Sequence, residues 1–349
     1  MYPRIEINLK KLKHNAITLI NICKKKRISI ALVTKVLAGN TRTIDEIANL
    51  GFTYIADSRL DNLREIGNIK TPKLLLRLPM ISEIKRLVEI ADISLNSELP
   101  TIKEINYQAE RLNIKHKIIL MFDLGDLREG IFYKDDYLKI VKEIIKLNNI
   151  SLVGIGTNLS CYGGVIPTNE KLNELVKIKN SIEKTFNIKL DIISGGNSSS
   201  LYMLENNEMP KEINNLRIGE ALFLGKETAF RKPFATLYDD IFTLKAELIE
   251  IKEKPSFPDG IIKTNAFGKK PIFEDKGLMN RGIIAIGNQD ISPENLIPLD
   301  DYNIIGGSSD HLILELKKNH MIGDVLKFNI NYQGLLQLMT SKYIRKVFL

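Results

Sequence analysis

The sequence predicts an α/β fold in which a parallel (β/α)8 TIM barrel is followed by a mostly-β C-terminal domain. Between residues 28 and 225, eight short apolar runs alternate with amphipathic stretches. Strands that alternate with helices pair in parallel, and eight such strands close a barrel. After residue 225 several runs alternate with a period of two between Pro, Gly and Asn clusters, and no long helical pattern returns until residue 334. This pattern is typical of an antiparallel sheet.

The eight predicted barrel strands are short apolar runs that end at turn residues: Ile28–Lys35, Thr53–Asp57, Lys73–Pro79, Asp92–Asn96, Lys117–Gly125, Ser151–Asn158, Leu190–Gly196 and Leu216–Gly225. Apolar residues at helical spacing predict these helices: Leu9–Lys24, Ile81–Ile90, Leu99–Leu112, Asp135–Leu147 and Asn169–Phe186. A doubly wound open sheet is the alternative. It requires a glycine-rich turn after the first strand, and residues 34–39 read TKVLAG, which does not match G-x-G-x-x-G.

The second domain is predicted from these strands: Phe242–Ile251, Gly282–Gly287, Tyr302–Gly306, His311–Leu316 and Asp324–Tyr332. A helix is predicted over Gly334–Val347. The N-terminal strand, Arg4–Asn8, precedes the first barrel helix, and we expect it to join the β domain. The predicted division is therefore a barrel of residues 9–225 and a β domain of residues 226–349 with residues 1–8.

Composition limits the class of protein. The chain has 349 residues and a net charge of +8, but its lysines are scattered along helices and form no basic stripe with aromatic residues, so nucleic-acid binding is not expected. The first residues form no apolar h-region and no run reaches membrane length, so we expect neither a secretory leader nor a membrane span. The two cysteines, Cys23 and Cys161, provide neither a disulfide framework nor a metal-ligand spacing. We expect a cytoplasmic enzyme with a small-molecule substrate, no metal and no membrane association.

One charged residue lies in the first predicted strand. Lys35 is near the end of the apolar run that begins at Ile28, where it either extends to solvent or is held for chemistry. The turn Ser194–Ser200, with the sequence SGGNSSS, contains glycines that let a backbone approach an anion and hydroxyl donors at a helix start. A plain capping turn is the alternative, but a cap does not need so many donors. A lysine on one strand and a phosphate cradle on another suggest pyridoxal phosphate.

Six segments in order resemble the fold-type III pyridoxal-phosphate enzymes of the alanine racemase superfamily, and most of all the ornithine racemases. They are Val33–Leu37, Phe122–Gly130, Ser194–Ser200, Asn215–Gly225, Gly282–Asp290 and Ile305–His311. The resemblance covers nearly the whole chain. It implies an amino-acid racemase that uses pyridoxal 5'-phosphate and acts as a homodimer, in which the β domain of one subunit completes the site of the other. The expected substrate is ornithine or lysine.

The resemblance also implies roles for single residues. Lys35 would carry the cofactor as a Schiff base and serve as one of two proton-transfer groups. The other cofactor-binding residues would be Asn197, Ser198, Arg217, Gly219, Glu220 and Tyr332, with Gly219 and Glu220 acting through backbone amides. Tyr332 can equally be an ordinary strand tyrosine.

Arg217 would face the pyridine nitrogen, where a permanently charged guanidinium disfavours ring protonation and weakens the electron sink. That arrangement favours racemisation over decarboxylation. A structural ion pair is the alternative reading of Arg217.

Two residues would bind substrate. Arg128 would form a bidentate contact with the substrate carboxylate, although Asp126 and Glu129 beside it offer a simple loop salt bridge instead. Asp310 would face the distal ammonium of ornithine or lysine. Gly39 stands where the family has a tyrosine, and the smaller residue would enlarge the pocket for such a substrate.

The sequence also departs from the family pattern. Phe267 and Asn158 stand where alanine racemases have a catalytic tyrosine and a supporting histidine. The second base is therefore open, with Ser309, His311 and Cys161 as candidates. Alternative functions are a racemase for alanine or another amino acid, a basic amino-acid decarboxylase of the same fold, a non-catalytic pyridoxal-phosphate protein, and a phosphate-binding barrel enzyme without this cofactor. Arg217 disfavours the decarboxylase, and residues 226–349 disfavour the non-catalytic carrier, because the small carrier proteins have one domain.

Overall fold

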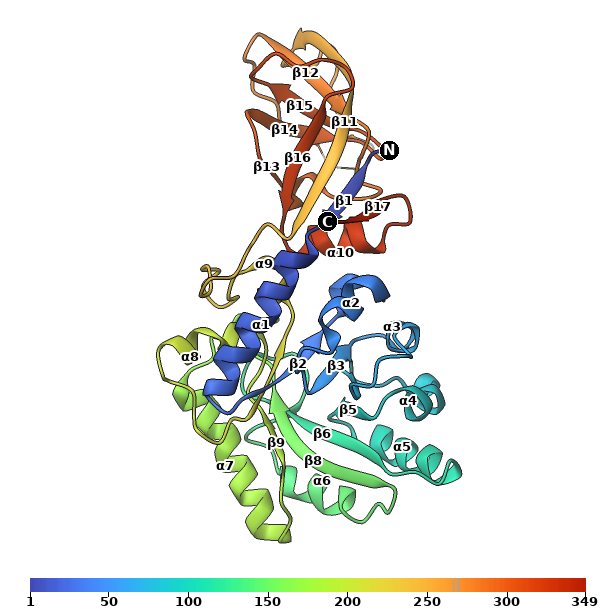
Figure 1. The fold of residues 1–349 in the computed structure, drawn as a ribbon, viewed down its shortest axis with the longest axis vertical. Coiled ribbons are helices and arrows are strands. Elements are labelled where there is room, and N and C mark those ends of the chain that lie inside the picture. The colour runs from blue at the N-terminus through green and yellow to red at the C-terminus, as the bar shows by residue number, and fades with distance from the viewer. Residues whose placement is uncertain (266, 269) are drawn as a thin grey trace. The chain divides into compact units, whose positions relative to one another are not determined.

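The computed structural model describes residues 1–265, 267–268 and 270–349. Contacts divide the chain into one unit of Lys10–Asp239 and another of Met1–Leu9 with Asp240–Leu349 (Figure 1). The sequence placed the boundary at residue 225, whereas residues 226–239 group with the first unit. Helix α1 (Leu9–Lys25) holds this segment, because the Asn15 amide donates to the Tyr238 carbonyl and accepts from the Tyr238 N–H, both at 2.8 Å.

The first unit is a closed barrel of parallel strands, which confirms the predicted fold class. The strands in order around the ring are β2 (Ser29–Val33), β3 (Tyr54–Asp57), β4 (Lys73–Leu75), β5 (Ile93–Asn96), β6 (His116–Asp123), β8 (Ile150–Thr157), β9 (Ile192–Ser194) and β10 (Asn215–Ile218). Pairing of β10 with β2 closes the ring, with Arg217 opposite Ala31. The short strand β7 (Ile131–Phe132) pairs with β6 outside it.

Helices lie around the strand ring (Figure 1). They are α2 (Thr41–Ala48), α3 (Leu60–Glu65), α4 (Ile84–Ile90), α5 (Leu99–Arg111), α6 (Tyr137–Ile144), α7 (Asn169–Phe186), α8 (Tyr202–Glu205) and α9 (Glu220–Leu224), with 3-10 turns at Lys35–Leu37, Ile81–Glu83 and Ser198–Ser200. Their apolar residues recur at helical spacing, as with the buried Ile102, Ile105 and Ala109 of α5, so each helix covers the barrel with one face.

The inside of the barrel is filled by alternate strand residues such as Val33, Ala56, Leu95 and Met121, all buried in one cluster. Strand β2 ends at Val33, and Lys35 begins the 3-10 turn that follows it. A charged side chain can follow an apolar strand here because it lies at the carboxyl end, where the apolar filling of the barrel stops. The carboxyl ends of the strands therefore carry the polar side chains of the barrel.

One predicted barrel strand is too long. The apolar run Leu216–Gly225 was expected to be a single strand, but β10 ends at Ile218 and residues 220–224 form α9. Glu, Ala and Leu favour helix, and Gly219 separates the two elements. Gly225 ends α9 with φ +69°, and a Cβ there would lie 2.6 Å from the Tyr238 carbonyl oxygen.

The second unit is a mostly antiparallel sheet in the order β13, β16, β11, β12, β15, β14. The elements are β11 (Phe242–Pro255), β12 (Leu278–Ile284), a 3-10 turn (Pro293–Asn295), β13 (Leu296–Pro298), β14 (Tyr302–Gly307), β15 (Leu312–Leu316), β16 (Val325–Ile330), α10 (Tyr332–Thr340) and β17 (Arg345–Phe348). The N-terminal strand β1 (Arg4–Ile7) lies between β11, which it pairs antiparallel, and β17, which it pairs parallel.

Two expectations for the C-terminus are wrong. The predicted helix Gly334–Val347 stops at Thr340, because residues 345–348 pair with the free edge of β1 instead. Tyr332 was placed at the end of a strand, but the strand ends at Ile330 and Tyr332 begins α10. The side chain of Asn331 caps this helix by accepting the Gly334 N–H at 2.9 Å.

Within the described ranges, no helix has the length and apolar character needed to cross a membrane. A search of the same residues finds no group of three or more His, Cys, Asp or Glu side chains arranged to hold a metal ion.

Candidate functional site

Lys35 is the first residue of the 3-10 turn that follows β2, and its side chain is half-buried. Burial lowers the pKa of Lys35, and the nearby Arg128 guanidinium lowers it further. Three groups act weakly in the opposite direction: Cys161, Asp57 and Glu220. A lysine with a lowered pKa supplies more neutral amine near neutral pH, which is the form that attacks a carbonyl group or accepts a proton.

The neighbouring strand β3 ends in Asp57, whose carboxylate is fully buried. Its Oδ2 accepts the Thr34 hydroxyl at 2.9 Å, and its Oδ1 accepts the Asn62 amide and the Arg59 N–H, both at 3.0 Å. Burial raises the pKa of Asp57, although these hydrogen bonds oppose the effect. Since Thr34 directly precedes Lys35, the Asp57 carboxylate fixes the backbone from which the lysine extends.

The turn after β9 and the start of α9 contact each other where the sequence predicts an anion cradle. Asn197 caps the 3-10 turn by accepting the Ser199 N–H at 2.8 Å, and the Ser198 hydroxyl accepts the Ala221 N–H at 3.2 Å. Gly219 precedes α9, and a Cβ at this position would lie 3.0 Å from the Val33 Cβ. Two helix starts therefore lie side by side, and backbone N–H groups at helix starts bind anions.

Glu220, whose backbone amide belongs to this cradle, also has a half-buried carboxyl group. Burial raises the pKa of Glu220, while Arg231 and Lys35 lower it.

The loop after β6 presents Arg128. The Asp123 carboxylate accepts the Gly125 N–H at 2.8 Å and the Leu127 N–H at 3.1 Å, which folds the loop back on the strand. Leu127 has φ +57° and Gly130 has φ +122°, and a Cβ on Gly130 would lie 2.5 Å from the Asp123 nitrogen. This tight loop fixes the backbone on both sides of Arg128 and Glu129.

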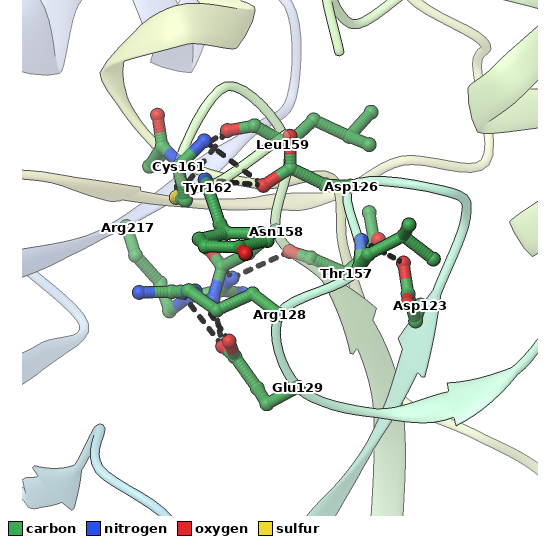
Figure 2. Close-up of polar contacts among 12 residues, drawn as sticks. Asp123, Asp126, Arg128, Glu129, Thr157, Asn158, Leu159, Cys161, Tyr162 and Arg217 are labelled. Atoms are coloured by element: carbon green, nitrogen blue, oxygen red, sulfur yellow. Dashed lines mark hydrogen bonds and ion pairs between the residues drawn. The ribbon is translucent and has the colours of Figure 1, made fainter. Parts of the chain in front are cut away.

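A buried carboxylate joins the loops after β6 and β8. Asp126 accepts three N–H groups, from Cys161 at 3.0 Å, Tyr162 at 2.8 Å and Val165 at 3.0 Å (Figure 2). Burial acts to raise the pKa of Asp126, but the backbone donors outweigh it and lower the pKa. The charged carboxylate thus sets the conformation of the loop that carries Cys161.

Cys161 lies beside the anion cradle. The Asn197 amide donates to its sulfur at 3.3 Å and to the Leu159 carbonyl at 3.0 Å. The residue is exposed overall, but partial withdrawal of the thiol from water raises the pKa of Cys161; Arg128 opposes the shift, while Asp126 and Glu129 add to it. The thiol is therefore protonated at neutral pH, and it can donate a proton more readily than it can accept one.

Arg217 projects from β10 into the barrel and is buried. Its guanidinium donates to the Thr157 carbonyl at 2.6 Å, to the Asn158 Oδ1 at 2.7 Å and to the Ser194 hydroxyl. Burial lowers the pKa of Arg217 to about 10, so the group remains charged at neutral pH. A Cβ on Gly156 would lie 3.3 Å from Arg217 Nη1, and the glycine thereby leaves room for the guanidinium.

Glu129 lies between the two arginines. Its Oε1 accepts Arg128 Nη2 at 2.7 Å and Asn158 Nδ2 at 2.6 Å, and its Oε2 contacts Arg128 Nε (Figure 2). The ion pair that the sequence offered as the alternative for Arg128 is thus present with Glu129, whereas Asp126 binds backbone amides. Sequence reasoning did not assign the bridge from Glu129 to Asn158, and it gave Asp57 no role beyond the end of the predicted strand Thr53–Asp57.

The barrel unit gathers eight of the predicted site residues at the carboxyl ends of its strands: Lys35, Arg128, Cys161, Asn197, Ser198, Arg217, Gly219 and Glu220. The β unit contains the others. Ser309, Asp310 and His311 form the turn between β14 and β15, where His311 Nδ1 lies 3.2 Å from Asp310 Oδ1. Tyr332 is half-buried at the start of α10.

The turn in the β unit is held by backbone contacts. The Gln289 N–H donates to the Ser309 carbonyl at 2.8 Å, and the Ser308 N–H donates to the His311 carbonyl at 2.8 Å. A Cβ on Gly287 would lie 2.5 Å from the Asp310 nitrogen. The backbone is therefore fixed, while the side chains of Asp310 and His311 extend toward solvent with exposed fractions of 73% and 44%.

Comparison with known proteins gives a consistent assignment. Residues 7–227 match the family model described as alanine racemase, N-terminal domain. The chain is 46% identical to the ornithine racemase of Acetoanaerobium sticklandii over 99% of each chain. It is 39% identical to the lysine racemase of Thermotoga maritima, over 100% of this chain and 99% of that protein.

Solved structures share the fold at low sequence identity. The alanine racemase of Clostridium difficile 630 matches with a TM-score of 0.74 at 20% identity, over 100% of this chain and 96% of that one. The alanine racemase of Bacillus anthracis matches with a TM-score of 0.75 at 17% identity and the same coverage. These matches span both units and agree with a barrel followed by a β domain.

Proposed function

Because the chain belongs to the alanine racemase family, we propose that it is an amino-acid racemase that uses pyridoxal 5'-phosphate and interconverts the L- and D-forms of ornithine or lysine. The observation that carries this proposal is the pairing of a half-buried lysine of lowered pKa with an anion cradle at the same end of the barrel. The similarity to an ornithine racemase and a lysine racemase over nearly full length supports a basic amino acid as substrate.

The barrel residues fit this cofactor. Gly196 has φ +112°, and a Cβ there would lie 2.8 Å from the Ser200 hydroxyl, so the turn depends on glycine to bring its backbone close to a phosphate. The cradle of Asn197, Ser198, Gly219 and Glu220 would hold the phosphate, and Lys35 Nζ would hold the aldehyde carbon.

Arg217 would face the ring nitrogen from within the barrel, where its own bonds to Ser194, Thr157 and Asn158 keep it in place. The bound cofactor withdraws electrons from the substrate and acidifies its α-proton.

The protein residues would bind the substrate and move the proton. Arg128 would hold the substrate carboxylate through its guanidinium. The Lys35 amine would take the α-proton from one face as the C–H bond breaks, and a second group would return a proton to the opposite face.

Cys161, Ser309 and His311 are the candidates for the second group. The protonated state of Cys161 suits a donor. Asp310 would pair with the distal ammonium. We further propose a cytoplasmic homodimer in which the β unit of each subunit completes the site of the other.

The test is α-proton exchange. The protein, loaded with pyridoxal phosphate, is incubated in heavy water with a panel of L-amino acids, and the α-proton signal is followed by NMR while chiral chromatography measures the D-form. We expect exchange and D-amino acid formation with ornithine or lysine, and a higher kcat/KM for one of them. Release of carbon dioxide with formation of a diamine, or no exchange with any amino acid, would refute the proposal.

A further inference from the structure

The Glu129 carboxylate is shared between two side chains that belong to different strand ends. Its side chain is only 16% exposed, and both of its oxygens contact Arg128, from the same loop. Oε1 also accepts the amide of Asn158, which follows β8, at 2.6 Å. A carboxylate that takes a guanidinium on two oxygens restricts the guanidinium to one plane.

The contact with Glu129 also decides which way the Asn158 amide points. An amide has a donor side and an acceptor side. With Nδ2 directed at Glu129, Oδ1 faces the Arg217 guanidinium at 2.7 Å. The reversed amide would place its oxygen against the carboxylate and its NH2 against the guanidinium, and both contacts would be repulsive. By this contact Glu129 keeps the Asn158 oxygen directed at Arg217, although Glu129 does not itself bond to Arg217 (Figure 2).

We infer that Glu129 is a positioning residue that holds Arg128 directly and Arg217 through Asn158, so that the two arginines of the site act as one rigid unit. The inference rests on the proposed function for the roles of the two arginines as ligands of the substrate carboxylate and the cofactor ring. The surrounding backbone is already fixed by Asp123 and Asp126, and the Glu129 side chain links the two loops at the level of the arginines.

Cys161 provides a probe of this unit that needs neither cofactor nor substrate. The chain has two cysteines, and Cys23 is buried with its pKa raised to about 12 by burial, so alkylation of the native protein reports on Cys161. The charged groups that act on the Cys161 thiol include Arg128, Asp126, Glu129 and Lys35, and Arg217 also interacts with it. Glu129 raises its pKa and Arg128 lowers it. In Glu129→Gln both changes act together, because a negative charge is lost and Arg128 is no longer neutralised.

The first experiment therefore measures the rate of iodoacetamide alkylation against pH for the cofactor-free wild type and Glu129→Gln. We expect the profile of the variant to move to lower pH, with several-fold faster alkylation near neutral pH. The matched control is Glu183→Gln on α7, which removes a carboxylate that similarly bridges a lysine and a backbone N–H but lies on the outer helix. Its alkylation profile should equal that of the wild type.

The second experiment measures kcat and KM for ornithine and lysine with the cofactor-loaded enzyme. Hydrogen bonds to charged groups are the strong ones, so we expect Glu129→Gln to lower kcat/KM by about 10- to 100-fold, with a raised KM from the loosened Arg128. Asn158→Ala removes only the link from Glu129 to Arg217. The Glu129→Gln change should therefore lower kcat/KM less in the Asn158→Ala background than in the wild type, because one of the two links that depend on Glu129 is already absent.

The outcomes distinguish a failure of the role of Glu129 from a failure of the proposed function. An unchanged alkylation profile, or an unchanged kcat/KM in an active enzyme, would overturn the role of Glu129. Fully additive effects of the two substitutions would overturn the coupling through Asn158. A wild-type protein that exchanges no α-proton would refute the proposed function and leave the alkylation experiment to decide the position of Glu129 by itself.

Discussion

At the carboxyl end of the barrel, the lysine side, near β2 and β3, and the arginine side, near β8 and β10, differ in how they hold their charged groups. Near β2 and β3, burial lowers the pKa of Lys35 and raises the pKa of Asp57, so both groups are shifted toward their neutral forms. Near β8 and β10, Arg217 is buried, but three acceptors surround its guanidinium, and its pKa of about 10 keeps it charged. Glu129 provides the compensating charge on this side.

This difference separates two tasks within one site. A group that gains or loses a proton during a reaction works best when its pKa lies near the pH of the reaction. A group that orients an anion or a ring nitrogen must keep its charge and its position. The lowered pKa of Lys35 therefore suits proton transfer, and the contacts of Arg217 suit a fixed positive charge.

The comparison predicts the largest loss for Lys35. Replacing it by Ala or by Arg should reduce α-proton exchange by about 10³-fold or more, because Arg keeps the charge but does not deprotonate. The exchange rate in heavy water measures the effect. Lys139→Ala on α6, where the lysine is exposed and makes a surface ion pair, is the matched control and should behave as the wild type. An active Lys35→Arg enzyme would remove the proton-transfer role from this side.

His116 tests whether acid affects the site or the whole barrel. It is buried at the start of β6 beside the Ser94 hydroxyl at 2.9 Å, and burial lowers the pKa of His116 to about 4. The unfolded chain binds the proton near pH 6.5, so His116 contributes stability that is present above that pH and is lost as the pH falls toward 4.

We expect the fall in the free energy of unfolding between pH 7 and pH 4 to be smaller by about 3 kcal/mol in His116→Asn. Urea unfolding at the two pH values measures it. An identical pH dependence in the variant and the wild type would show that His116 does not titrate in this way. The comparison also identifies the pH range in which a loss of activity belongs to the site and not to unfolding.

Two glycines of β8 distinguish an effect on the Arg217 guanidinium from an effect on packing alone. A Cβ on Gly156 would lie 3.2 Å from Met121 Sδ and 3.3 Å from Arg217 Nη1, so Gly156→Ala should displace the guanidinium and reduce kcat about 10-fold with a cost of about 1–3 kcal/mol in stability. A Cβ on Gly154 would lie 2.2 Å from the Ile192 carbonyl oxygen. Gly154→Ala should therefore cost more stability but leave the kcat of the folded enzyme unchanged. A lowered kcat in Gly154→Ala with an unchanged kcat in Gly156→Ala would contradict the conclusion that Gly156 leaves room for the Arg217 guanidinium.

The sequence was informative where one residue differed from its local pattern. Lys35 stood out as a charge at the end of an apolar strand, Arg217 was singled out by the family resemblance, and the alternation of apolar runs with helices predicted the ring of parallel strands. Periodicity failed at Leu216–Gly225, because a continuous apolar run is compatible with either a strand or a helix.

The C-terminal strand β17 depends on pairing with β1, which is distant in sequence, and local preference cannot reveal such a partner. The bridge from Glu129 to Asn158 depends on a loop with a positive φ at Leu127, and a leucine in the sequence does not predict that conformation. Sequence thus indicates candidate site residues one at a time, whereas the contacts that orient them depend on the fold.

Asp57 is the smallest and most specific test of the lysine side. In Asp57→Asn the Asn62 amide and the Arg59 N–H keep an oxygen acceptor, and the Thr34 hydroxyl can accept the new NH2 while it donates to the Ala56 carbonyl, which already lies 3.3 Å away. The fold should persist. Because the Asp57 charge raises the pKa of Lys35, its removal should lower that pKa further, and the acid limb of the kcat/KM profile should move to lower pH with a change of less than about tenfold at the optimum.

Stability gives a second readout of Asp57. Burial raises its pKa in the folded state, so the wild type should lose stability as the pH rises through that value, and Asp57→Asn should remove this loss. A pH profile of the variant that coincides with that of the wild type, with stability also unchanged, would mean that Asp57 only ties Thr34 in place. The Asp57 charge would then not oppose the lowering of the Lys35 pKa by burial and Arg128, and of these two charges only Arg128 would act on the lysine side.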